Sequence, residues 1–323
     1  MIRVRLPLPA PKILNFFIDF RMQIIVNGLA VEYADEGRGR ILLLLHGWGD
    51  NLHTFDFLAK ILSQNMRVIR LDLPGFGKSE TPPNAWHVAD YVAFVAEFLR
   101  KIGVGSAGVT SAEVGSVGVR NTGVSSVGVG DAAVSSAGVG SVDFIAGHSF
   151  GGRIIIKGIA SRGFSAEKII LISSAGVARR GKMRAALWKF FAKAGSAAMR
   201  MPPLNAWRGA ARKKLYSRLG SDYASSGAGA LKGTYLNIIN EDLAPAAEQI
   251  KTPALLIWGE KDDVTPLEEG ERLSKLISGS RLKVLRGAGH FVHREQPREV
   301  AQYMSEFIFS SEASSKSSSE AKK

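Results

Sequence analysis

The stretch VDFIAGHSFGG, residues 142–152, sets a serine between two glycines where an apolar run meets a second one. Residues 142–147 have the composition of a buried β-strand, and residues 151–161, GGRIIIKGIAS, are expected to form a helix. GHSFG fits the pattern Gly-x-Ser-x-Gly, in which a sharp strand-to-helix turn lifts the serine hydroxyl clear of a sheet. Glycines on both sides relieve the crowding that side chains would cause in such a turn. The stretch therefore predicts Ser149 as a nucleophile rather than a structural serine.

Strand and helix patterns alternate on both sides of this turn. A hairpin is expected over residues 22–35, because Asn27-Gly28 readily adopts the positive φ angles of a tight turn. Further strands are expected at 41–47, 66–75, 142–147, 168–174, 253–259 and 282–285, and helices at 87–102, 151–161, 267–278 and 297–309. This order predicts an α/β protein with a mainly parallel central sheet covered by helices on both faces.

Four tandem decapeptides occupy residues 103–142, between a predicted helix and the predicted strand before Ser149. They read GVGSAGVTSA, EVGSVGVRNT, GVSSVGVGDA and AVSSAGVGSV, with valine, serine, glycine and valine fixed at the second, fourth, sixth and seventh places. Such small residues bury little surface, so the repeat is expected to be a low-complexity insertion on the protein surface. Helix and strand would otherwise be joined by a loop of about 2–6 residues.

The net charge of +13 is concentrated in one segment. Residues 178–218 contain twelve lysines and arginines and no aspartate or glutamate, which leaves a net +1 for the rest of the chain. Residues 178–250 lose the alternating pattern and are expected to form several short basic helices. An anionic substrate or an acidic carrier near this segment is one interpretation, and a solvated helical surface is the other.

A serine hydroxyl needs a base to remove its proton and a carboxylate to orient that base. The best candidate base is His290 in GAGHFVHREQP, directly after the last predicted strand. Asp262 in WGEKDDVTP follows another strand, and its neighbour Asp263 is an alternative for the acid. The order Ser, Asp, His is typical of this kind of sheet. His293 is expected to be a surface side chain on the final loop.

Together these motifs resemble the α/β-hydrolase family, in its serine-nucleophile, esterase- or lipase-like branch. The resemblance covers roughly residues 22–309, apart from the repeat and much of the basic segment. It rests on HGWGD (46–50), DLPGFGKS (72–79), GHSFGG (147–152), WGEKDDVTP (258–266) and GAGH (287–290), all in family order. The family pattern places the acid three residues after the glycine of the WG pair, which selects Asp262 over Asp263.

The resemblance also implies the remaining parts of an enzyme. The backbone N–H groups of Trp48 and Phe150 would form an oxyanion hole, and residues 178–250 would form a helical cap. The implied activity is hydrolysis of carboxylic esters of small molecules through an acyl-enzyme. Thioesters, lactones, carbon–carbon bonds and carrier-protein methyl esters are alternative substrates within the family, and a non-catalytic ligand-binding protein of this fold is a further alternative.

The other histidines and the GKS triplet are expected to be structural. His46 and His148 accompany their motifs and are expected to pack or hydrogen-bond locally, whereas His53 and His87 are expected at the surface or at a helix start. A phosphate-binding loop would need glycine where Asp72 stands, so LPGFGKSE is interpreted as a structural turn. Histidines and acidic residues show no metal-ligand spacing, so neither a metal nor a cofactor is expected.

Composition sets the remaining expectations. The chain of 323 residues has no cysteine, which excludes disulfides and cysteine metal sites. No apolar run approaches the ~20 residues of a transmembrane helix, and a cytoplasmic location without a nucleic-acid partner is expected. The predicted organisation is an N-terminal extension (1–21), a first core part (22–177) carrying the repeat, the basic cap (178–250), a second core part (251–309) and a disordered tail (310–323).

Overall fold

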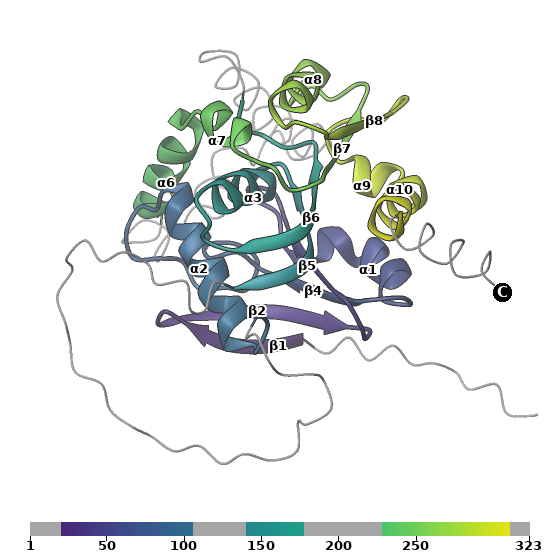
Figure 1. The fold of residues 1–323 in the computed structure, drawn as a ribbon. Coiled ribbons are helices and arrows are strands. Elements are labelled where there is room, and N and C mark those ends of the chain that lie inside the picture. The colour runs from purple at the N-terminus through teal and green to yellow at the C-terminus, as the bar shows by residue number, and fades with distance from the viewer. Residues whose placement is uncertain (1–20, 106–139, 178–227, 311–323) are drawn as a thin grey trace, which may run out of the picture.

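A computed structural model of the chain describes residues 21–105, 140–177 and 228–310. They form one eight-stranded sheet in the order β1-β2-β4-β3-β5-β6-β7-β8, with helices on both sides (Figure 1). Residues 1–20, 106–139, 178–227 and 311–323 lie outside the described part. The predicted N-terminal extension and tail, most of the repeat and the basic part of the cap fall there.

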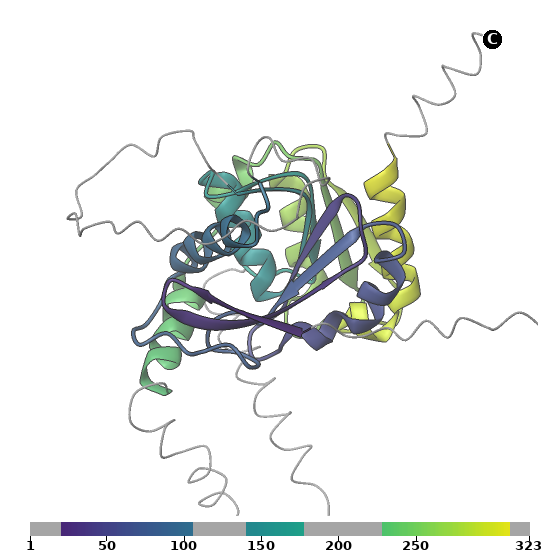
Figure 2. The same cartoon turned by 90° about the horizontal axis from the view of Figure 1, so that it is seen from below.

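The sheet is mainly parallel, as the sequence predicts. Its antiparallel edge is the hairpin of β1 (Arg21–Val26) and β2 (Leu29–Glu36), seen edge-on in Figure 2. Asn27 and Gly28 turn this hairpin with φ angles of 50° and 80°, and β2 pairs antiparallel with β4. The parallel strands are β3 (Ile41–Leu45), β4 (Arg67–Leu71), β5 (Ser141–His148), β6 (Ser165–Ile172), β7 (Ala254–Gly259) and β8 (Arg281–Leu285).

The strand register brings the carboxyl ends of the central strands to one edge. Gly147 of β5 lies opposite Leu45 of β3 and Leu171 of β6, and Leu171 lies opposite Leu256 of β7. Loops that follow these strands therefore begin next to one another. Open α/β sheets bind their ligands at this edge, and Ser149 stands there, two residues beyond Gly147.

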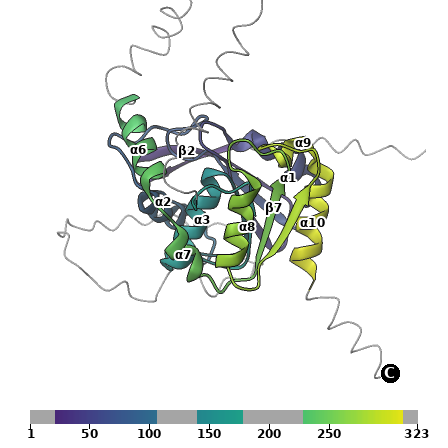
Figure 3. The same cartoon turned by 90° about the horizontal axis from the view of Figure 1, so that it is seen from above.

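Alternate residues of each central strand face opposite helical layers. Leu43 and Leu45 pack in the layer of α2 (Val88–Lys101), α3 (Phe150–Ala160) and α8 (Leu267–Leu276). Leu42 and Leu44 pack in the layer of α1 (Asp56–Leu62) and α10 (Pro297–Phe309). Figure 3 shows α3 and α8 on one side of β7 and α10 on the other. Burial on both faces explains why these strands are continuous apolar runs.

Two helices of the expected cap are described, and neither is strongly basic. They are α6 (Ala228–Asn240), whose one charged residue is Lys232, and α7 (Ala244–Glu248). The twelve cations at 178–218 lie outside the described residues, so their arrangement stays a prediction. None of the described helices is long and apolar enough to cross a membrane.

The ends of the decapeptide repeat belong to the core rather than to a surface excursion. Val104 is buried in the layer of α2, and β5 already begins at Ser141. A Cβ added to Gly140 would lie 3.2 Å from Cβ of Leu99 on α2, so this residue too is packed. The predicted boundaries of 103 and 142 are thus too wide, because valine suits both the repeat and a buried strand.

Candidate active site

Ser149 occupies a strained turn between β5 and α3. Its φ of 49° lies in the left-handed region, which non-glycine residues adopt uncommonly and at a cost in backbone strain. Backbone hydrogen bonds hold the turn: Ser149 N donates to Ile172 O (3.0 Å), and Ala175 N donates to Ser149 O (3.1 Å). A Cβ on Gly147 would lie 2.5 Å from the backbone carbon of Gly151, so the glycines are required by close backbone contact.

His290 and Asp262 form a buried pair at the same edge of the sheet. The Nδ1 atom of His290 lies 2.9 Å from Oδ2 and 3.1 Å from Oδ1 of Asp262. The ring of His290 also packs against the ring of His148, the residue before Ser149, with 4.7 Å between the ring centroids. A carboxylate at Nδ1 fixes the imidazole in the tautomer whose Nε2 can accept a proton.

Asp262 is itself fixed by the loop that follows it. Its Oδ1 accepts hydrogen bonds from the backbone N–H groups of Val264 (3.0 Å) and Thr265 (2.9 Å). The hydroxyl of Thr265 lies 2.9 Å from Asp262 Oδ2 and 3.2 Å from His290 Nδ1. Burial acts to raise the pKa of Asp262, but the bonds from His290 and Thr265 outweigh it and lower that pKa. Asp262 is therefore charged at neutral pH, and Thr265 is a supporting residue that the sequence patterns did not reveal.

The two alternatives for these roles lie in different surroundings. Asp263 is exposed, whereas Asp262 is buried against His290. The expectation of a surface side chain at His293 is wrong, because His293 is only 1% exposed. Its Nε2 lies 2.8 Å from the hydroxyl of Thr54 in the helical segment η1 (Leu52–Phe55). The short helix α9 (Val292–Glu295) turns this side chain inward.

The remaining histidines lie where the sequence predicts them. His46 is buried, and its Nδ1 lies 2.7 Å from Gly47 O while its Nε2 accepts from Leu73 N (2.9 Å). His148 donates from Nε2 to the backbone oxygen of His290 (3.0 Å). His53 is half-buried in η1, and His87 caps the start of α2.

Burial keeps three of these imidazoles neutral. It lowers the pKa of His46 and of His148, the latter well below its ordinary value. Burial, with the charges of His290 and Arg294, also lowers the pKa of His293 to about 3. Desolvation disfavours the charged form of any imidazole, so these side chains are uncharged at neutral pH.

Trp48 and Phe150, whose N–H groups the resemblance assigns to an oxyanion hole, line the same cavity as Ser149. Phe150 is the first residue of α3, where backbone N–H groups have no partner within the helix. The two rings pack edge-to-face at 5.6 Å, and Tyr235 of α6 lies 5.4 Å from the Trp48 ring. A cavity of about 30 Å³ opens at Ser149, lined also by Trp48, Phe150, Arg153, Ala175, Tyr235, Ile238 and Ile239. Side chains of α6, Tyr235, Ile238 and Ile239, thus form part of the wall of the cavity at Ser149.

Asp72 explains why LPGFGKSE is a structural turn. Its Oδ1 accepts from the backbone N–H of Leu52, and its Oδ2 accepts from that of Lys78, both at 2.7 Å. The carboxylate therefore ties the loop after β4 to the loop after β3, which carries Trp48. A phosphate has no place there, because a buried carboxylate already occupies these donors.

Two charged residues, the buried Arg153 and the partly buried Glu269, were not anticipated. Arg153 of α3 is 1% exposed and donates from Nη2 to the backbone oxygens of Ile238 and Glu241 at the end of α6. Burial lowers its pKa to about 10 against the raising effect of nearby carboxylates. Burial and, in the same direction, the negative charge of Asp262 raise the pKa of Glu269 on α8 to about 7. Only the structure reveals these groups, since neither belongs to a motif.

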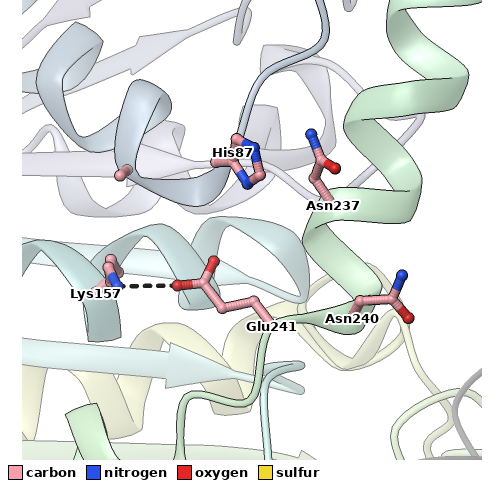
Figure 4. Close-up of a pocket in the computed structure, with 6 residues that line it drawn as sticks. His87, Lys157, Asn237, Asn240 and Glu241 are labelled. Atoms are coloured by element: carbon pink, nitrogen blue, oxygen red, sulfur yellow. Dashed lines mark ion pairs between the residues drawn. The ribbon is translucent and has the colours of Figure 1, made fainter.

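A second cavity, of about 450 Å³, lies at the surface between the start of α2, α3 and the end of α6 (Figure 4). Lys157 and Glu241 form an ion pair of 2.9 Å across it. Its lining residues are His87, Ala89, Lys157, Asn237, Asn240 and Glu241. None of these is a candidate catalytic residue, so the larger cavity is separate from the site at Ser149.

Comparisons with known proteins show which hydrolases the chain resembles in sequence and in fold. The chain is 23% identical over 298 residues to the uncharacterized hydrolase YugF of Bacillus subtilis, covering 88% of this chain and 94% of that protein. Its fold matches an esterase from Thermogutta terrifontis (TM-score 0.60, 18% identity, 90% and 98% of the two chains). It also matches the enol-lactonase from Burkholderia xenovorans LB400 (TM-score 0.61, 19% identity, 89% and 99%).

A model of the alpha/beta hydrolase family matches residues 42–303, which include all the candidate catalytic residues. That span runs from β3 to α10 and takes in the Ser149 turn and the Asp262–His290 pair. The chain belongs to the alpha/beta hydrolase family.

Proposed function

We propose that the chain is a serine hydrolase that cleaves carboxylic esters through an acyl-enzyme. Ser149 is the nucleophile, His290 the general base and Asp262 the acid that orients it. The proposal is supported by the buried Asp262–His290 pair, whose imidazole packs against His148, the residue before a serine held at positive φ on a strand-to-helix turn. Such a pair beside a strained serine is the arrangement that activates a weak hydroxyl nucleophile.

The proposed reaction has two halves. The Ser149 hydroxyl attacks the ester carbonyl while Nε2 of His290 takes its proton, and Asp262 balances the positive charge on the imidazole. The N–H groups of Trp48 and Phe150 donate to the tetrahedral oxyanion, each worth about 3 kcal/mol. His290 then protonates the leaving alcohol. A water attacks the acyl-enzyme through the same base, which releases the acid and restores Ser149.

The cavity limits which esters fit beside Ser149. Trp48, Phe150 and Tyr235 make its wall aromatic, and its volume of about 30 Å³ suits a short acyl chain. Residues 178–227, which complete the cap in the sequence, lie outside the described residues. A panel of p-nitrophenyl esters of increasing chain length measures the preference directly, and we expect the shortest chains to give the highest kcat/KM.

Labelling with a fluorophosphonate tests the mechanism, because the probe phosphonylates only an activated serine. Wild type should be labelled at Ser149, as mapped by peptide mass spectrometry, and Ser149→Ala should not be labelled. Ser161→Ala, at the far end of the same helix, is the matched control and should label like wild type. Labelling that persists in folded Ser149→Ala protein would disprove the assignment, and a folded, unlabelled wild type would favour a non-catalytic binding protein.

The twelve cations at 178–218 support a narrower proposal, that the cap recruits anionic substrates or an acidic carrier. Salt screens attraction between separated charges. The kcat/KM for an ester with an added carboxylate should therefore fall with ionic strength, while that for its neutral analogue should not. If kcat/KM for the two esters responded equally to ionic strength, the basic segment would be only a solvated surface without a role in recruitment.

A further inference from the structure

Three side chains from separate segments of the chain meet close to the Asp262–His290 pair. Asp50 follows β3, His148 ends β5 and His293 lies in α9, and each offers one oxygen or ring nitrogen within 4.8 Å of the other two. Asp50 Oδ2, His148 Nδ1 and His293 Nδ1 are buried and have no hydrogen-bond partner among the described residues. Buried polar atoms in proteins are nearly always paired, so three such atoms together point to a ligand site.

The opposite nitrogen of each imidazole is already engaged. His148 Nε2 donates to the backbone oxygen of His290 at 3.0 Å, which leaves the lone pair on Nδ1. The Nε2 atom of His293 lies 2.8 Å from the Thr54 hydroxyl, and when this nitrogen donates to that oxygen, the lone pair of the ring lies on Nδ1 too. Histidines that bind metals typically donate their second N–H to a carbonyl, carboxylate or water in this way.

The chemistry and the space suit a cation rather than an anion. Two lone pairs and a carboxylate oxygen repel one another unless a positive charge or a hydrogen-bond donor lies between them. A Cβ at position 47 would lie 2.8 Å from His148 Nδ1, so Gly47 keeps the space before that atom open. Asp50 is partly exposed and gives an ion a way in.

We propose that Asp50, His148 and His293 bind one divalent transition-metal ion. Zn²⁺ fits best, because it takes imidazole nitrogens and carboxylate oxygens at about 2.0–2.2 Å and accepts water in the remaining positions. The ligands lie far apart in sequence, which is why no metal-ligand spacing is visible there. Bound there, the ion would join the loops that carry Trp48, Ser149 and His290, and so stabilise the fold around the candidate active site.

Metal binding can be measured without reference to catalysis. Full-length protein is stripped with a chelator and titrated with ZnCl₂ by calorimetry, and with CoCl₂ by the visible absorption of the bound ion. We expect one Zn²⁺ per chain and a rise in melting temperature on binding, since a ligand of the native state stabilises it. Asp50→Asn and His293→Gln should each weaken binding at least about tenfold.

The control variant is His53→Gln, which removes a histidine three residues from Asp50 that is paired instead with Asp56. It should bind Zn²⁺ like wild type, and so should Ser149→Ala, which separates this site from the proposed catalytic serine. Asp50 is partly exposed, so Asp50→Asn tests the site even where His293→Gln fails to fold. Absence of binding, or equal binding by wild type and Asp50→Asn, would overturn the proposal and assign the space to a water molecule.

Discussion

The Nδ1 atom of His290 lies 2.9 Å from Asp262 Oδ2, whereas the next residue, Asp263, is exposed to solvent. Asp262→Asn should therefore reduce kcat for ester hydrolysis by a factor on the order of 10⁴, because an amide favours the wrong imidazole tautomer and cannot offset its charge. Asp263→Asn should stay within about threefold of wild type, as expected of surface changes. Steady-state kinetics on a p-nitrophenyl ester compare the two, and a larger loss in Asp263→Asn would reverse the assignment.

His293 should contribute to stability rather than to the proton transfer. His293→Ala removes a buried ring, 5.0 Å from that of Phe55, together with the bond to Thr54. We expect the free energy of unfolding in urea to fall by about 2–4 kcal/mol. His53→Ala, at a half-buried histidine, is the control and should change it by less than about 1 kcal/mol. A kcat loss in folded His293→Ala equal to that of His290→Ala would give His293 a catalytic role.

The sequence predicts the sheet and the candidate residues at its strand ends because these depend on local patterns, and the family resemblance then selects Asp262 over Asp263. Continuous apolar runs are typical of strands buried on both faces, and each candidate catalytic residue follows a predicted strand. Burial of His293 was not predictable in this way, since it depends on Thr54, 239 positions away. The contacts of Arg153 and Glu269 were not predictable either, because both residues lie in ordinary amphipathic helices. Their roles arise from how helices pack at the carboxyl edge of the sheet, which periodicity does not encode.

Glu269 should make the protein less stable as the pH rises. Its pKa is raised from 4.5 to about 7, chiefly by burial. Between pH 4.5 and about 7, Glu269 is therefore protonated in the folded state and ionised in the unfolded state. Stability present below pH 4.5 is then lost as the pH rises through about 7. Glu269→Gln, which stays neutral, should exceed wild type by about 1–3 kcal/mol at pH 8 and match it near pH 4.5.

Glu268→Gln is the matched control for that experiment. Glu268 lies on the same helix but its side chain is exposed, whereas the Oε2 atom of Glu269 is buried. Urea unfolding at pH 4.5, 6 and 8 should give it the pH dependence of wild type. A Glu269→Gln protein less stable than wild type at pH 8 would mean that the charged carboxylate stabilises Arg153 more than its burial costs.

Arg153 should act on substrate binding through helix α6. Its Nη2 bonds to the backbone oxygens of Ile238 and Glu241 hold the end of α6, whose Tyr235 and Ile238 line the cavity at Ser149. Arg153→Met leaves both oxygens unpaired, so we expect KM to rise about tenfold, equivalent to about 1.4 kcal/mol, with kcat within about threefold. Lys157→Met, one turn further along α3, removes a partly exposed ion pair and should change KM little. A fall in kcat alone would contradict this role.

The decapeptide repeat should be removable if its packed ends are kept. Val104 and Val142 are buried, and a Cβ on Gly105 would overlap the backbone nitrogen of Ser141, so the two ends of the insertion lie in contact. The chain there enters the amino end of β5, at the opposite end of the strand from Ser149. Replacing residues 106–139 by a short Gly-Ser linker should therefore preserve the fold and most of the esterase activity.

Stability should change little or rise in that variant, since each halving of a loop recovers roughly 0.6 kcal/mol of closure entropy. The matched variant lacks all of residues 103–142 and so loses Val104, Val142 and the start of β5. It should lose soluble yield or melting temperature, because buried valines leave cavities when removed. Melting curves and kcat/KM on one p-nitrophenyl ester compare both with wild type. A loss above about tenfold in kcat/KM in the shorter deletion, with its fold intact, would mean that residues 106–139 take part in catalysis.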